Sequence, residues 1–327
     1  MSTEDRPLKR AREDEPDSEV PIQRSADYWF EDGSIVLQVE GIQFRVAKTI
    51  LAMHSTVFKD MLTLPPTDEP LVEGCPVVHL SGDTPEDWGH LLAAMHPKDY
   101  FPEEKPTFAS LSSVLRLSNK YDFPVFRRQC ISRLKGEFPA TFASYDAAPG
   151  YWSKIDMPAE WSASETSVNV VNLAREVGLY SILPCALYII VNRPDPEGHG
   201  VLGDVLSKLN RREDEILCLR AYARLVQDPT NTRTRCFRNG AIPHPHCDHA
   251  TICETAAATN FVQSMLNPLV VVSVVDEWDE SWEEDLCEAC VDAAKAVHEA
   301  ARKECWEMLP SYFGLPKWDE LLKLDLV

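Results

Sequence analysis

The most regular hydrophobic pattern lies between Asp27 and Leu64, where apolar residues first alternate and then recur at helical spacing. The alternating positions, typical of half-buried strands, are Ile35, Leu37 and Val39 and, after a turn at Glu40-Gly41, Ile42, Phe44 and Val46. The positions at three- and four-residue steps are Ile50, Leu51, Met53, Val57, Phe58, Met61 and Leu62. This stretch therefore predicts a β-hairpin followed by one amphipathic helix.

Shorter hydrophobic patterns continue to about residue 134 and complete a unit that contains both strands and helices. Residues 77–80 predict another strand. Thr84 and Pro85 predict a helix start, because threonine can cap a first turn and proline suits the first helical position. The apolar side of this helix is predicted to be Trp88, Leu91, Leu92 and Met95. With two further helices at 108–118 and 123–134, the order of elements predicts an α+β fold in which helices cover a small sheet.

From residue 138 onward, the spacing of apolar residues predicts helices only. Segments with helical spacing are 168–177, 184–191, 202–209, 213–226, 252–266 and 285–308. The stretches 138–167 and 228–249 lack such spacing and are expected to be connections. The apolar positions of the helix at 213–226 are Ile216, Leu217, Leu219, Ala223 and Val226. The predicted stripe of the last helix is Leu286, Cys290, Ala293, Val297, Ala301, Cys305 and Met308.

Composition narrows the classes of function. The net charge is −20 and the pI about 4.8, which argues against direct binding of nucleic acid and against docking on anionic membranes. No apolar run approaches the ~20 residues that span a bilayer, and the polar N-terminus is unlike a signal peptide. We therefore expect an intracellular protein of the cytoplasm or nucleus, whose ten cysteines are thiols or metal ligands.

Residues 1–24 are charged and nearly free of apolar side chains, so we expect a disordered tail. Within it, Lys9, Arg10 and Arg12 form a short basic cluster. Such a cluster can be read by nuclear import receptors, although a few cations in a flexible tail are also common by chance. The cluster is therefore a candidate nuclear signal.

The cysteines suggest one candidate site. Cys287 and Cys290 form a C-x-x-C, and Cys247 and Cys253 lie upstream. Four thiolates can hold zinc in a closed tetrahedral site, which is the structural type because no position is left for water. The alternative is that these cysteines are ordinary core or surface thiols. A thioredoxin-like redox role is disfavoured, because the C-x-x-C lies in a helical, acidic context without a βαβ pattern.

No catalytic motif was found. The chain contains no phosphate-binding G-x-x-x-x-G-K-S/T loop, no G-x-S-x-G and no H-E-x-x-H. We therefore expect a protein that is not an enzyme and that has no cofactor besides the candidate zinc. The aromatic C-terminal stretch 306–318 is expected to dock on the helical domain, with presentation to a partner as the alternative.

Four segments resemble the BTB (POZ) domain. They are Asp32–Gly41, Phe44–Ala52, Ser55–Leu62 (similar to the S-P-V-F-x-x-M segment) and Lys120–Pro124 (similar to the K-Y turn between late helices). Among BTB proteins, the chain is most similar to the single-BTB proteins of mushroom-forming fungi. The resemblance implies a BTB domain at 25–137, followed by a helical C-terminal domain at 138–327.

The resemblance also implies a function. BTB domains bind protein partners and commonly form homodimers, and some recruit cullin-type ubiquitin ligases. The alternatives are thus self-association or partner binding, a cullin adaptor, and a transcription-associated regulator acting through partners. Tyr28, Trp29 and Phe30 lie in the segment that BTB dimers use, so they are interface candidates unless the rings fold onto their own core. Ala47 stands where the family prefers histidine, which puts the local polar network in doubt.

Overall fold

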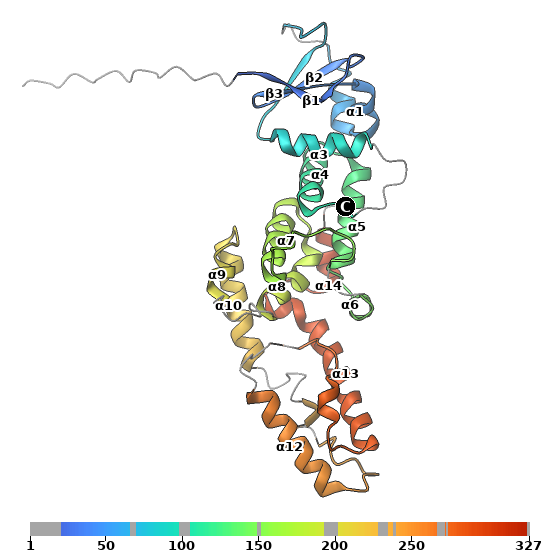
Figure 1. Cartoon of the computed structure of the whole chain (residues 1–327), viewed down its shortest axis with the longest axis vertical. Coiled ribbons are helices and arrows are strands. Elements are labelled where there is room, and N and C mark those ends of the chain that lie inside the picture. The colour runs from blue at the N-terminus through green and yellow to red at the C-terminus, as the bar shows by residue number, and fades with distance from the viewer. Residues whose placement is uncertain are drawn as a thin grey trace, which may run out of the picture. The chain divides into compact units, whose positions relative to one another are not determined.

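The computed structural model describes residues 21–65, 70–97, 105–148, 152–192, 202–227, 235–237, 240–266, 272 and 274–325. The chain divides into two compact units, Met1–His96 and Pro97–Val327 (Figure 1). This division falls inside the segment 25–137 that the sequence predicts as one domain. Among the helices in the described ranges, none is both long enough and apolar enough to cross a bilayer.

The first unit contains a four-stranded mixed sheet (Figure 1). Its strands are β1 (Gln23–Trp29), β2 (Ile35–Val39), β3 (Ile42–Val46) and β4 (Val77–Leu80), in the spatial order β1-β3-β2-β4. The hairpin is confirmed: β2 and β3 are antiparallel, Leu37 faces Phe44, and Glu40 adopts a positive φ of 48° in the turn. The strand at residues 77–80 is also confirmed, and it pairs parallel with β2.

Strand β1 was not predicted, and it corrects the expected tail. Gln23 and Arg24 belong to this strand, where the sequence predicts disorder through residue 24, and residues 1–20 lie outside the described residues. Five of its seven residues are polar or small, so no apolar alternation identifies it. The strand forms at the edge of the sheet by pairing parallel with β3. Tyr28 and Trp29 therefore lie within a strand rather than before the first one.

The prediction of a single helix after the hairpin is also wrong. The chain forms two short helices, α1 (Lys48–His54) and α2 (Thr56–Met61). Ser55 separates them in an extended conformation, and its hydroxyl accepts a hydrogen bond from the Phe58 N–H. An N-cap therefore interrupts the apolar repeat. Leu51 and Phe58 are buried, whereas Met53 is 70% exposed.

Helix α3 (Pro85–Met95) begins and packs as its sequence predicts. The Thr84 side chain accepts a hydrogen bond from the Asp87 N–H, and Pro85 occupies the first turn. All four predicted apolar positions are buried. The indole N–H of Trp88 donates to the Asp83 carboxylate at 3.0 Å, and the Phe58 ring meets the indole edge-on at 5.9 Å. The core of this unit therefore joins α2 and α3 to the sheet.

In the second unit, helices α4 (Phe108–Lys120) and α5 (Pro124–Glu137) form an adjacent pair. The 3₁₀ helix η1 (Tyr180–Ile182) and α14 (Trp318–Leu324) lie together, and η1 also contacts α5. The predicted docking of the C-terminal aromatic stretch is confirmed, because Trp306, Phe313 and Trp318 are buried. The indoles of Trp306 and Trp318 stack at 5.2 Å. Thus the C-terminal helix packs into this unit.

The expected connection at 138–167 instead contains helix α6 (Phe142–Asp146) and the start of α7 (Ala163–Val177). A capping box begins α7, since the Ser162 hydroxyl accepts from the Glu165 N–H and the Glu165 carboxylate accepts from the Ser162 N–H. The S-x-x-E spacing of Ser162 and Glu165 in the sequence is the signature of such a box. Gly178 ends α7 in the left-handed conformation, as predicted. The adjacent helix α8 (Leu183–Asn192) is buried at every position.

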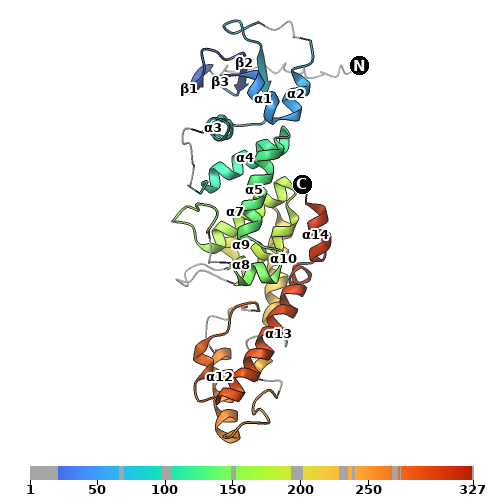
Figure 2. The same cartoon turned by 90° about the vertical axis from the view of Figure 1, so that its right-hand side faces the viewer.

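The rest of the unit is formed by α9 (Leu202–Leu206), α10 (Arg212–Gln227), α12 (Ala250–Leu266), η2 (Glu280–Glu283) and α13 (Glu288–Tyr312). Figure 2 shows α12 beside the first half of α13. Among the described residues after Glu137, the structure has helices and no strand. The predicted helical C-terminal region is therefore confirmed.

Two predicted helix faces are partly wrong. Helix α10 buries Cys218, Ala221 and Leu225, whereas the predicted positions Ile216 and Leu219 are 40% and 46% exposed. Its apolar residues form two faces, and the sequence pattern favoured the one that remains exposed. Helix α13 begins three residues later than predicted, and Met308 from its predicted stripe is 51% exposed.

Candidate functional site

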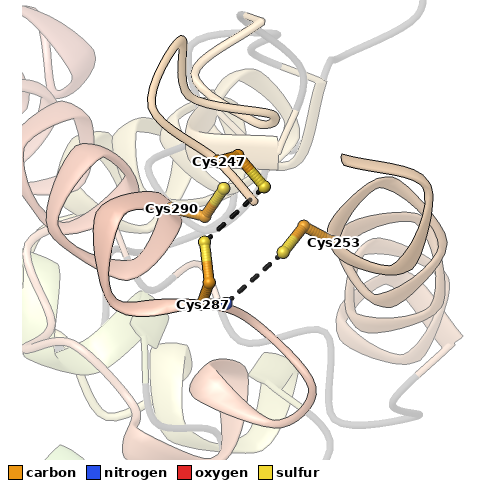
Figure 3. A group of neighbouring side chains, drawn as sticks. All are labelled: Cys247, Cys253, Cys287 and Cys290. Carbon is orange, nitrogen blue, oxygen red and sulfur yellow. Dashed lines mark hydrogen bonds between the residues drawn. The ribbon is translucent and has the colours of Figure 1, made fainter. Parts of the chain in front are cut away.

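Four cysteines from three chain segments converge in the second unit (Figure 3). Cys247 lies in the loop before α12, and Cys253 lies in the first turn of α12. Cys287 is the N-cap residue of α13, and Cys290 lies in its first turn. The structure thus brings together all four residues that the sequence singled out as candidate ligands.

The spacing of the sulfur atoms is that of a compact cluster. All four Sγ atoms lie within 4.8 Å of one another, and those of Cys247 and Cys287 are 3.6 Å apart. A disulfide requires about 2.05 Å, and none of the ten cysteines forms one. In a tetrahedral four-thiolate site with Zn–S bonds of about 2.3 Å, neighbouring sulfurs are about 3.8 Å apart. The observed separations match the metal geometry better than a disulfide.

Backbone N–H groups point at sulfurs of the cluster. The N–H of Cys287 donates to Cys253 Sγ at 3.3 Å (Figure 3). The N–H of His244 donates to Cys290 Sγ at 3.4 Å. Donors of this kind stabilise negative charge on ligating thiolates. The sequence could not reveal them, because a backbone donor carries no residue-type signal.

The local environment gives the two thiols of the C-x-x-C different pKa values. A hydrogen bond from the backbone N–H of Cys290 lowers the pKa of the Cys287 thiol to about 7, as expected at a helix N-terminus. Burial raises the pKa of the Cys290 thiol to about 12. Cys253 and Cys290 are buried, whereas Cys247 and Cys287 are half-buried. Two of the four thiols are therefore shielded from solvent and two are partly accessible.

The nearby histidines do not join the described four-sulfur group. The rings of His244 and His246 lie 5.3 Å apart, and the N–H of His246 bonds to Nδ1 of His244. His298 is buried elsewhere on α13, against the indoles of Trp278 and Trp282. The cluster that the structure describes is thus made of sulfur ligands alone.

The aromatic residues at the N-terminal edge of the sheet are all half-buried. Tyr28 packs on Phe44 at 6.5 Å, and Phe30 packs on His96 at 5.2 Å. The guanidinium of Arg24 lies 4.5 Å above the Trp29 ring. The rings therefore fold partly onto their own unit and remain partly accessible.

Ala47 is the N-cap residue of α1, and its side chain makes no cap hydrogen bond. The Ser34 hydroxyl instead accepts from the Lys48 N–H at 3.0 Å. This contact satisfies one N–H of the first turn without the family's usual histidine. The candidate nuclear-signal residues Lys9, Arg10 and Arg12 lie outside the described residues.

Comparison with known families supports the reading of the N-terminal part. Residues 31–137 match the family model of the BTB/POZ domain. No curated protein matches the chain. Together with the mixed four-stranded sheet and its helices, the match establishes that the chain carries an N-terminal BTB/POZ domain, followed by a helical C-terminal region. BTB/POZ domains are protein–protein interaction modules and are generally not enzymes.

Proposed function

We propose that the protein acts through protein–protein interaction and that its BTB/POZ domain self-associates along the edge formed by β1. The observation that carries the proposal is the BTB/POZ match over residues 31–137, directly after an exposed edge strand. The pairing and the side chains of β1 indicate why this strand is the proposed contact surface.

Strand β1 pairs on one side only with another described strand, β3. Edge strands offer backbone hydrogen-bonding groups to a second chain. The half-buried ring of Trp29 adds apolar area, and aromatic residues are enriched at interfaces. Arg24 on the same strand lies over this ring and also pairs with Glu73 at 2.6 Å, so charged groups lie beside the ring. The edge strand thus offers both an aromatic and a charged group to a second chain.

Light scattering on the full-length protein over a range of concentrations tests self-association. The wild type should show twice the chain mass, and Trp29→Ser should shift the equilibrium toward the monomer. The control is Leu322→Ser, which removes an exposed apolar side chain from α14, outside the sheet edge. A wild type that stays monomeric at the highest concentration would refute self-association. A dimer unaffected by Trp29→Ser would exclude this edge.

The more specific roles differ in their partners. A ubiquitin-ligase adaptor should retain a cullin when the tagged full-length protein is purified, and the cullin should be identified by mass spectrometry. A transcription-associated regulator should accumulate in the nucleus, and replacing Lys9, Arg10 and Arg12 with alanine should abolish that accumulation.

A further inference from the structure

We propose that Cys247, Cys253, Cys287 and Cys290 bind one zinc ion in a closed, structural four-thiolate site. This site is separate from the BTB/POZ domain and independent of the function proposed for that domain. The inference rests on the convergence of four sulfurs, on the hydrogen bonds that they accept, and on the sparse packing of the segments that they join.

The convergence is specific to these four residues. The other six cysteines, at positions 75, 130, 185, 218, 236 and 305, are all buried, and none belongs to a described cluster of metal-ligand type. Cys247 and Cys287 are separated by 40 residues, yet their sulfur atoms are 3.6 Å apart. Ordinary core thiols are dispersed among apolar side chains. Four sulfurs within 4.8 Å of one another are close enough to reach one shared ion.

The ligand chemistry selects the metal and the type of site. Four thiolates favour a soft or borderline ion in tetrahedral geometry, which is the preference of zinc in structural sites. They would give the zinc site a net negative charge. The N–H groups of His244 and Cys287 point at two of the sulfurs, and the positive end of α13 lies at Cys287 and Cys290. Because protein ligands fill all four positions, the zinc would hold structure rather than activate water.

The packing around the cluster is sparse, so a bound metal would contribute to its stability. The described buried side chains of α12 are small or polar: Cys253, Ala256, Ala257 and Asn260. An open hollow of about 460 Å³ lies beside these residues, between Glu284 and Asp285 and the side of α12 that carries Thr255, Ala256, Thr259 and Asn260. Small side chains bury little apolar area, so they stabilise the contact weakly. We therefore infer that the zinc ties α12 and its preceding loop to the N-terminus of α13.

Metal analysis of the full-length protein, expressed with zinc and purified under reducing conditions without a chelator, tests the proposal. The wild type should contain one zinc per chain. Cys253→Ser and Cys287→Ser should each lose most of it. Cys130→Ser is the matched control, because Cys130 is buried on α5 outside the cluster, and this variant should retain one zinc. A wild type with far less than one zinc, or equal loss in the control, would overturn the proposal.

A second measurement remains decisive if the variants fold poorly. Wild-type protein reconstituted with cobalt(II) should show the strong thiolate-to-cobalt charge-transfer absorption and the visible bands of a tetrahedral four-sulfur site. A spectrum indicating octahedral or oxygen-rich coordination would contradict the assignment. So would a reversible Cys287–Cys290 disulfide in protein that takes up no metal.

Hydrogen exchange then tests the structural role. Removing the zinc with a chelator should accelerate amide exchange in residues 244–260 and 282–292, while α7 and α8 change little. Uniform acceleration throughout the second unit, or no change near the cysteines, would contradict a zinc that ties α12 to α13.

Discussion

Lys135 Nζ lies 2.6 Å from Oδ2 of Asp325, so an ion pair joins α5 to the residue that follows α14. The same carboxylate accepts hydrogen bonds from the backbone N–H and the hydroxyl of Ser181, at 2.9 and 2.6 Å. The side chain of Asp325 is fully buried, whereas that of Lys135 is 32% exposed. One carboxylate thus connects the last helix of the BTB/POZ match, the 3₁₀ helix η1 and the C-terminal helix.

Replacing Asp325 with alanine should therefore destabilise the protein. The buried Ser181 N–H and hydroxyl lose their acceptor, at a cost of about 2–3 kcal/mol in the free energy of unfolding, while Lys135 can turn to solvent. Urea denaturation followed by circular dichroism measures the change. The control is Asp319→Ala on the same helix, where an exposed pair with Lys323 should contribute less than about 0.5 kcal/mol. Equal effects of both variants would contradict this account.

Trp318→Ala should be among the most destabilising changes at the C-terminus. The indole is 8% exposed, stacks on Trp306 and donates its N–H to the Trp306 carbonyl at 2.9 Å. Removing a buried aromatic ring costs about 3–5 kcal/mol. Trp318→Phe should cost less, because stacking survives while the hydrogen bond is lost. Thermal melting would show this order, and Leu322→Ala provides a control at an exposed position of the same helix.

Ala47→Ser should stabilise the first unit. Ala47 has the extended backbone of an N-cap residue, with φ −75° and ψ 117°, but no side-chain acceptor. A serine hydroxyl there could accept from an N–H in the first turn of α1, for a gain of about 0.5–1 kcal/mol. Thr84→Ala, which removes an existing cap from α3, should act in the opposite direction. Differential scanning calorimetry would record the two shifts, and a loss of stability in Ala47→Ser would contradict the cap model.

Arg302→Lys should be destabilising although it preserves charge. The guanidinium donates to the Val275 carbonyl at 3.1 Å and to the carboxylates of Asp146 and Glu299, and it lies 5.0 Å from the Phe142 ring centre. A lysine ammonium lacks the planar fork needed for all these contacts, so we expect a loss of about 2 kcal/mol. Guanidinium denaturation of Arg302→Lys and Lys303→Arg compares this site with its exposed neighbour. Equal stabilities of the two variants would refute a special role for the planar guanidinium of Arg302.

The sequence revealed those features that local chemistry determines. The hairpin followed from alternation around a turn, and α3 from its cap, its proline and its apolar side. The cysteine cluster could be anticipated because C-x-x-C spacing and a second pair restrict the geometry of a four-ligand site. The hairpin and α3 depend on few residues close in sequence, whereas the cysteines could be paired in advance because their residue type limits what they can bind.

Other features depend on tertiary structure. Strand β1 has little apolar alternation, and its pairing with β3 forms it. The break at Ser55 lies within a continuous apolar repeat, so hydrophobicity alone merges α1 and α2. Helix α10 has apolar residues on two faces, and only packing decides that Cys218, Ala221 and Leu225 are the buried ones. The backbone donors around the cysteines likewise follow from the fold and not from residue type.

Helix α8 has no solvent-facing side, because all ten of its residues are buried. A survey of random substitutions would therefore find nearly uniform intolerance across Leu183–Asn192, without the three- or four-residue rhythm seen in amphipathic helices. Such a block of sensitive positions could be mistaken for a binding motif. Its sensitivity would instead measure how completely the neighbouring helices enclose it.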